Sequence, residues 1–287
     1  MHNSNIFSAI NNEYFHLTGS EKKVADYVQS HGAEVQFMSI SDLSEACGVA
    51  DATVSRFCRR MKLRGYSDFK LALAKAEAES NHPLPLDSPA APSVEEDDIS
   101  FRMNKVYSSN VLAMRQSIER VNPEALSRAA QLLLRANRVW CMGQGGSMIL
   151  ADETAHLFST VCDKFVSISD SHRQLSHAAL FRPDDVLFFL SYSGSTKEMM
   201  DVLHLAKHRG APCIVVTRFP KSPGALLADI SLQCGSDEGP LKMGSMPARM
   251  AQLLLVDILF QEFCHLDPIQ TDVNRELIID ALAEKHL

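Results

Sequence analysis

Hydroxyl side chains cluster directly after a strongly apolar segment of the sequence, at Ser191, Ser193, Ser195 and Thr196, with Gly194 between them. The segment 186–191 predicts a buried strand and 196–209 predicts an amphipathic helix, so the hydroxyls lie in the loop that opens the helix. Hydroxyls and the N–H groups of a helix N-terminus are suited to hold a phosphate. Ser195 or Thr196 is also needed to cap the helix, but capping does not explain Ser191 and Ser193. The loop therefore predicts a phosphate site.

A glycine-rich turn ends an earlier apolar segment and carries Gly143, Gly145, Gly146 and Ser147. Such a turn between a strand and a helix points backbone N–H groups at an anion. The pattern alone leaves a second interpretation equally open, in which the glycines only close a tight turn. The two loops follow strands one and three of the predicted sheet, and open α/β sheets bind ligands at the carboxyl ends of their strands. We therefore expect the loops to form one site.

The elements that position these loops alternate between strands and helices. Strands are predicted at 138–142, 164–168, 186–191, 213–217 and 230–234, and helices at 147–160, 171–180, 196–209 and 223–228. This order predicts an α/β fold, a doubly wound sheet of five parallel strands with helices on both faces. Helices at 99–121, 123–136 and 248–264 are expected to flank the sheet or to join subunits. Helix 248–264, which contains Leu253, Leu254, Leu255, Ile258 and Leu259, fits a dimer interface and an ordinary core equally well.

The first part of the chain has a different, all-helical pattern. Thr18 and Glu21 have the spacing of a capping box, and the helix after them is expected to bury Val24, Ala25, Tyr27 and Val28. Two further short helices, 41–47 and 51–61, flank a tight turn at residues 48–50. Apolar side chains are expected to hold these two helices together, at Ile40, Leu43 and Ala46 on one side and at Val49, Val54, Phe57 and Met61 on the other. The pattern predicts a helix-turn-helix.

The opposite face of the second helix is predicted to bind DNA. Between residues 56 and 75 seven basic side chains accompany a single acid, Asp68. Residues at the helix start are expected to read bases, namely Asp51, Ala52, Thr53, Ser55 and Arg56. Residues farther along are expected to contact the DNA backbone, namely Arg59, Arg60, Lys62, Arg64 and Lys70. Spacing alone does not separate this hypothesis from an ordinary solvated helix face.

The surrounding sequence adds a resemblance to a known family. Residues 17–28, 39–43, 48–49, 52–54, 56–58 and 65–70 resemble the N-terminal domain of the RpiR-type regulators. The resemblance spans most of residues 1–77 and implies DNA binding. Ala50 departs from the family pattern, which usually places a capping serine there, and Asp51 is expected to take over the cap.

Residues 122–265 resemble the sugar isomerase (SIS) domain. Its S-x-S-G-x-T motif is matched at Ser191, Ser193, Gly194 and Thr196, and its G-x-G-x-S loop at Gly143, Gly145 and Ser147. The resemblance implies that these loops hold the phosphate of a phosphosugar. Lys242 and Arg249 could approach the ligand, although solvated or structural roles fit each of them better.

Composition sets the domain organisation. The chain has 287 residues, 46% of them hydrophobic, which is enough for two cores. A helix-turn-helix domain is expected at 1–77 (motif 39–61), a proline-rich and acidic linker at 78–98, and a SIS-like domain at 99–287 with its core at 122–265. The net charge of −7 argues against a protein that is basic throughout, so the basic stretch is local.

Several classes of protein are not indicated. We find neither a signal sequence nor an apolar run long enough for a bilayer, and expect a cytoplasmic protein with no membrane partner. The seven cysteines are odd in number and scattered, which predicts buried, reduced thiols. His204 and His208 have the spacing of a metal pair, but a third ligand is missing from the pattern. No metal and no cofactor are expected.

The sequence thus predicts a transcription regulator of sugar-metabolism genes. Its expected partners are operator DNA, a phosphorylated sugar effector and further copies of itself in a homodimer or homotetramer. The alternative is a phosphosugar isomerase, with Glu198 or Glu238 as general base and His172 or His177 as acid–base group. We rank below both a sugar-phosphate-binding regulator of another protein. The fused DNA-binding block favours a regulator that is not an enzyme.

Overall fold

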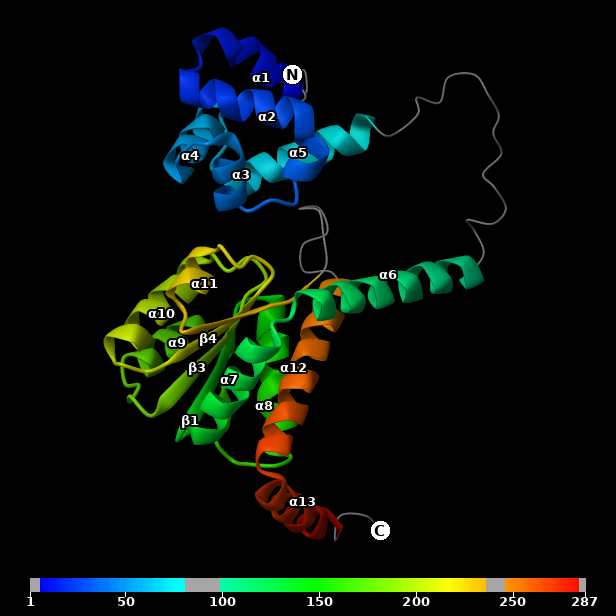
Figure 1. Cartoon of the computed structure of the whole chain (residues 1–287), viewed down its shortest axis with the longest axis vertical. Coiled ribbons are helices and arrows are strands. Elements are labelled where there is room, and N and C mark those ends of the chain that lie inside the picture. Colours follow the sequence, from blue (N-terminus) through cyan, green and yellow to red (C-terminus); the bar gives the residue numbers. More distant parts are fainter. Residues whose placement is uncertain (1–5, 81–98, 236–245, 284–287) are drawn as a thin grey trace. The chain divides into compact units, whose positions relative to one another are not determined.

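The computed structural model describes residues 6–80, 99–235 and 246–283. They form two compact units, and the division between the units falls inside one long helix, between Lys105 and Val106. Figure 1 shows the helices and strands of each unit. Residues 81–98 of the predicted linker lie outside the described residues, whereas residues 78–80 still belong to a helix of the first unit. In the described ranges no helix has both the length and the apolar character needed to cross a membrane.

The N-terminal unit is helical. It contains α1 (Ile6–Glu13), a 3-10 helix η1 (Tyr14–His16), α2 (Gly19–Val35), α3 (Ile40–Cys47), α4 (Asp51–Arg60) and α5 (Tyr66–Ser80). The predicted capping box opens α2, and a second one opens α3, where Ser39 and Asp42 exchange hydrogen bonds. Gly48 ends α3 with a φ of 61°, which a residue with a Cβ rarely adopts. The turn between α3 and α4 is thereby fixed.

The core of this unit contains most of the side chains expected there. Leu43, Val54 and Phe57 are fully buried, and the rings of Phe57 and Phe69 pack edge to face, with centroids 5.6 Å apart. Tyr27, Ile40 and Val49 are half-buried and pack against this core. One expectation was wrong: Ala46 is exposed because Cys47, one position farther along α3, faces the core instead.

The C-terminal unit is the predicted α/β fold. Its strands are β1 (Arg138–Gly143), β2 (Phe165–Ser167), β3 (Asp185–Leu190), β4 (Cys213–Thr217) and β5 (Ile230–Gln233), all parallel and in the order β2-β1-β3-β4-β5. Its helices are the part of α6 (Ile99–Arg120) from Val106 on, α7 (Pro123–Arg135), α8 (Gly146–Ser159), α9 (Ser171–Ala178), α10 (Lys197–His208), α11 (Pro223–Leu227), α12 (Met246–Leu266) and α13 (Pro268–Ala283).

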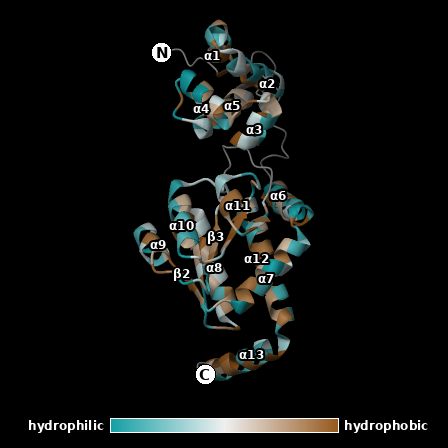
Figure 2. Cartoon of the chain, turned by 60° about the vertical axis from the view of Figure 1, so that its left-hand side comes forward, coloured by the Kyte–Doolittle hydropathy of each residue, from teal (hydrophilic) through white to brown (hydrophobic). Residues whose placement is uncertain are grey.

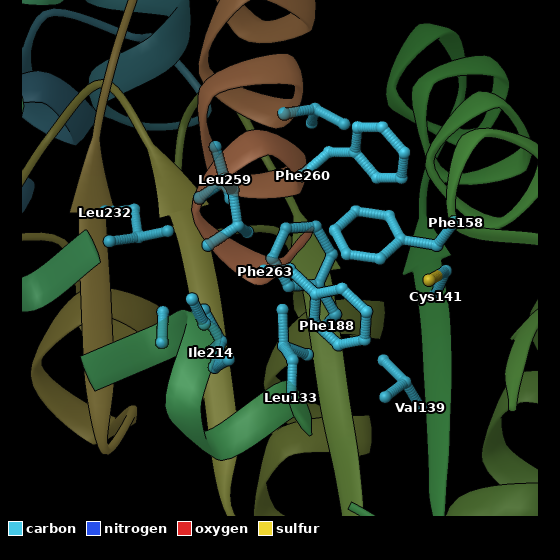
Figure 3. Packing of buried hydrophobic residues seen from close by; sticks show 14 of the residues in the cluster. Leu133, Val139, Cys141, Phe158, Phe188, Ile214, Leu232, Leu259, Phe260 and Phe263 are labelled. Carbon is cyan, nitrogen blue, oxygen red and sulfur yellow. The ribbon is translucent and has the colours of Figure 1, made fainter. Parts of the chain in front are cut away.

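Helices cover both faces of the sheet. One apolar cluster joins α7, α8 and α12 to the sheet, and in it the ring of Phe158 is edge-on to Phe260 and Phe263 (Figure 3). The same ring stacks on Phe165, with centroids 4.1 Å apart. A second cluster joins α9 and α10 to the opposite face. Both faces of β3 are therefore buried, which explains its continuous apolar sequence. Figure 2 shows the hydrophobic colouring of this strand and of α12.

Helix α12 belongs to the core, because Leu255 and Leu259 are buried in the first cluster. Helix α13 was not predicted. Its interior position is the polar Thr271, whereas Ile269, Val273 and Leu277 are 80%, 45% and 63% exposed. The packed side also carries the half-buried Asn274, Arg275 and Ile278, so it contains one apolar residue among polar ones and gave no amphipathic pattern to find.

The cysteines are free thiols in the interior, as predicted. Six are buried and Cys162 is half-buried. Burial raises the pKa of the Cys47 thiol to about 11 and that of the Cys234 thiol to about 12. They therefore remain protonated near neutral pH.

Candidate functional site

The two predicted loops lie next to each other at the carboxyl edge of the sheet. Strand β1 pairs with β3 in a register that sets Gly143 opposite Leu190, the last residues of the two strands. The glycine-rich loop after Gly143 and the serine-rich loop after Leu190 therefore start side by side. The chain continues from β1 toward β2 on one side and from β3 toward β4 on the other, so the loops flank the topological switch point of the sheet.

The serine-rich loop has a fixed backbone. Ser191 is buried, and its Oγ accepts a hydrogen bond of 3.1 Å from the N–H of Gly194. Gly194 has a φ of 61°, and a Cβ at this position would lie 2.1 Å from Ser222 Oγ. Its carbonyl accepts a hydrogen bond of 2.9 Å from the N–H of Gly224. Glycine is required here by both conformation and space.

Thr196 is the most informative hydroxyl in this loop. It occupies the N-cap position of α10, yet its side chain does not cap the helix. Its Oγ1 is buried and has no hydrogen-bond partner. A buried, unpaired hydroxyl is costly, which points to a missing binding partner. Ser193 is half-buried and Ser195 is exposed, and neither caps α10.

The glycine-rich loop is equally constrained. Gly143 is buried, and a Cβ there would lie 2.6 Å from the carbonyl oxygen of Ser147. Gly145 has a φ of 55° and precedes α8 without capping it through a side chain. Gly145 and Gly146 are exposed and Ser147 is half-buried. The backbone comes so close to Gly143 that the tight turn by itself explains why this residue is a glycine. The start of α8, by contrast, has no side-chain cap, and such a helix start suits an anion.

Sequence reasoning missed two residues that support the loops. Thr217 Oγ1 donates to the carbonyl oxygen of Tyr192 at 3.1 Å, which holds the serine-rich loop from β4. Gln174, in α9, is fully buried and donates to the carbonyl oxygen of Gly143 at 3.0 Å. The available signal was a glutamine at an interior position of an amphipathic helix.

Four predicted DNA-contacting side chains are exposed and basic: Arg56 and Arg59 on α4, and Lys62 and Arg64 in the segment after it. Ser55 is half-buried between them. Figure 2 shows the hydrophilic colouring of α4. These residues form a basic surface that follows the second helix of the motif and the turn after it.

Other predicted DNA contacts are used inside the unit. Thr53 is buried and accepts a hydrogen bond of 3.2 Å from Arg56 Nη2, so it is not presented on the outer face. Lys70 is buried and donates to the carbonyl oxygen of Met38 at 3.1 Å, and burial lowers the pKa of its amine to about 8. Lys70 therefore does not belong to the basic surface.

Arg60 and Asp51 also make internal contacts. Arg60 donates to the carbonyl oxygen of His16 and lies 3.6 Å from the Glu21 carboxylate. Asp51 does not cap α4, because Ala50 is the N-cap residue and Asp51 is the first helical residue. Its carboxylate instead accepts hydrogen bonds from the hydroxyls of Ser41, at 2.9 Å, and Ser44. Asp51 thus ties α3 to α4.

The weaker candidates do not converge. Glu198, His172, His204 and His208 are exposed, and the ring of His177 packs on Trp140 at 5.0 Å. Arg249 is half-buried, with Nε unpartnered. Glu238 and Lys242 lie outside the described residues. Among the described side chains, no group of three or more His, Cys, Asp or Glu residues could hold a metal ion.

The chain combines a helical unit that contains a helix-turn-helix with a SIS-like unit that carries two loops suited to bind a phosphate. This combination defines a class of two-domain regulators. Residues 4–80 match the model of the helix-turn-helix domain of the rpiR family, and residues 132–261 match the SIS domain. The chain belongs to the RpiR family of HTH-type transcriptional regulators.

Individual relatives agree with this assignment. An uncharacterized HTH-type transcriptional regulator of Caldanaerobacter subterraneus is 34% identical over 85% of both chains. The regulator RpiR of Escherichia coli is 26% identical over 91% of this chain and 86% of its own. The structure of the Vibrio vulnificus NanR protein complexed with ManNAc-6P covers 98% of both chains at 26% identity, with a TM-score of 0.86.

The role of Asp51 can be tested by replacing it. Asp51→Ala removes the acceptor of two hydroxyls, one of them on the buried Ser44, and is expected to destabilise the N-terminal unit by about 1–3 kcal/mol. Urea unfolding followed by circular dichroism measures this loss, with Glu34→Ala on the exposed surface of α2 as the matched control. A variant with unchanged stability but altered preference for DNA bases would show instead that Asp51 reads DNA.

Proposed function

We propose that the chain binds operator DNA through its N-terminal unit and that a phosphorylated sugar, bound at the two loops, controls this binding at genes of sugar metabolism. The single observation that carries the ligand proposal is the buried, unpartnered hydroxyl of Thr196 at the start of α10. A phosphate oxygen supplies the missing acceptor for this hydroxyl, and the uncapped helix N-terminus favours the negative charge.

The arrangement around Thr196 supports the same ligand group. Gly194 brings the backbone into a left-handed turn, and Ser193 and Ser195 flank it with two further hydroxyls. Uncharged hydroxyl and N–H groups can bind a phosphate dianion without a positively charged side chain, as helix N-termini do in other proteins. The NanR relative, which was solved with ManNAc-6P, makes an amino-sugar phosphate a suitable first probe.

For DNA binding, the proposed contacts are the exposed Arg56 and Arg59 of α4, with Lys62 and Arg64 on the phosphate backbone and Ser55 near the bases. Arg60, Thr53 and Asp51 are proposed to support the motif through contacts within the N-terminal unit. Arginine suits both phosphate oxygens and guanine edges, so the base-reading role falls on Arg56, which lies nearest the helix start.

We propose that the acting species is a homodimer or homotetramer. The apolar side chains of α13, Ile269, Val273 and Leu277, lie opposite its packed face and would be covered by another copy. A symmetric dimer presents two recognition helices, which predicts a palindromic operator with half-sites about 34 Å apart.

We also propose that the C-terminal unit acts without catalysis. The relatives are regulators by name, and the candidate general base Glu198 is exposed to solvent at the first turn of α10. Turnover of aldose and ketose phosphates by the purified protein, lost in Glu198→Gln, would establish the isomerase alternative instead.

Thr196→Val provides the sharpest test of the ligand site. Because the hydroxyl is unpaired in the free protein, its removal is expected to leave the melting temperature unchanged or slightly higher. A phosphosugar at about 100 times its Kd should stabilise the unmodified protein by about 2.7 kcal/mol. The variant should bind the phosphosugar about 10- to 100-fold more weakly, because it loses one hydrogen bond to a charged group.

The measurement is a thermal-shift screen of ManNAc-6P, glucose 6-phosphate and ribose 5-phosphate. Ser159→Ala, an exposed serine at the end of α8, is the control and should respond like the unmodified protein. Equal ligand shifts in Thr196→Val and in the control would contradict the site.

The DNA surface predicts a salt effect. Arg56→Ala combined with Arg59→Ala should lower the affinity for DNA, and if both contact phosphates, the slope of log K against log salt should fall by about 2. Arg128→Ala, an exposed arginine of α7, serves as the control. Fluorescence anisotropy with the DNA upstream of the gene and with random DNA measures both effects. An unchanged slope would remove α4 from the interface.

A further inference from the structure

A buried glutamine connects three elements beneath the glycine-rich loop. Gln174 is 0% exposed, and its Nε2 donates to two carbonyl oxygens, that of Gly143 at the end of β1, 3.0 Å away, and that of Ile168 just after β2, 2.7 Å away. Its Oε1 accepts a hydrogen bond of 2.6 Å from Nε2 of Gln144. Gln174 thus joins α9 to the carboxyl ends of two neighbouring strands and to the loop between β1 and α8.

This network fixes the orientation of both amides. Carbonyl oxygens can only accept, so the atom of Gln174 that faces Gly143 and Ile168 must be the NH2 group. The other end of Gln174 is then the oxygen, which can only accept, so Gln144 must approach it with its own NH2 group. As a result, the remaining oxygen of Gln144 is turned away from Gln174.

The position of Gln144 places it beside the phosphate loop. It directly follows Gly143, which pairs with Leu190, and Leu190 directly precedes Ser191. Gln144 is half-buried, so a bound molecule can reach it, and the groups that hold it are uncharged. A fixed amide oxygen in this place is suited to accept a hydrogen bond from a hydroxyl or amide N–H group.

We propose that Gln144, held in place by Gln174, recognises the sugar part of the ligand, whereas the serine-rich loop holds its phosphate. This inference rests on the proposed function and adds a specificity-determining residue and a positioning residue to it. Gln144 selects for a hydroxyl or N–H donor on the sugar, and Gln174 sets the position and orientation of its amide.

Binding of the sugar can be separated from binding of the phosphate. The affinity of the full-length protein is measured calorimetrically for ManNAc-6P, glucose 6-phosphate and ribose 5-phosphate, and inorganic phosphate is measured as a competitor. Gln144→Met is expected to lower the affinity for the tightest-binding of the three sugar phosphates about three- to tenfold and to leave the affinity for inorganic phosphate unchanged. Gln174→Met should act in the same direction, and Gln131→Met, at an exposed position of α7, should change neither affinity.

Thr196→Val should lower the affinity for both sugar phosphate and inorganic phosphate. This difference from Gln144→Met distinguishes the phosphate part of the site from the sugar part. Equal loss of both affinities in Gln144→Met would overturn its role in specificity, and so would unchanged affinity for the sugar phosphate. Gln174→Met removes a buried hydrogen-bond network, so the fold of this variant is checked by circular dichroism. If the Gln174→Met variant is unfolded, the result for Gln144→Met decides the question. Failure of the unmodified protein to bind any sugar phosphate would contradict the proposed function itself.

Discussion

The pairing of β1 with β3 brings together the two loops on which the proposed ligand site depends. Both strands are interior strands of the sheet, and both faces of β3 are covered by helices, so a shift of their register would disrupt close packing on both faces. That register sets Gly143 opposite Leu190. The packing energy of the core thereby maintains the two loops at the switch point of the sheet, where each opens a different helix.

The framework that fixes the two loops leaves one buried hydroxyl at this edge without an internal partner. Backbone and side-chain contacts fix the serine-rich loop through Ser191, Gly194 and Thr217, and Gln174 fixes the glycine-rich loop. The Thr196 hydroxyl is not used by this framework. A prearranged polar group costs the folded protein some stability but does not need to be ordered when a ligand binds.

Local sequence patterns predicted the elements and both loops well, because strand and helix periodicities follow directly from burial. Long-range contacts were harder to predict. Arg60 and Lys70 were assigned to a DNA surface by residue type, yet each contacts a distant part of its own unit, at His16 and Met38. Thr53 was assigned to the same surface but is buried. Periodicity shows which face a residue occupies only approximately, and it does not show hydrogen-bond partners. Gln174 was missed for the same reason, and α13 because its packed face is mostly polar and most of its apolar residues are exposed.

The central claim is that ligand binding and DNA binding are coupled within one protein. The most direct test measures the affinity for upstream DNA with and without a saturating sugar phosphate, for the unmodified protein and for Thr196→Val. The account predicts that the sugar phosphate changes the DNA affinity of the unmodified protein by about 5- to 150-fold, and that Thr196→Val needs a higher ligand concentration for the same change. A sugar phosphate that binds tightly and leaves the DNA affinity unchanged would contradict it.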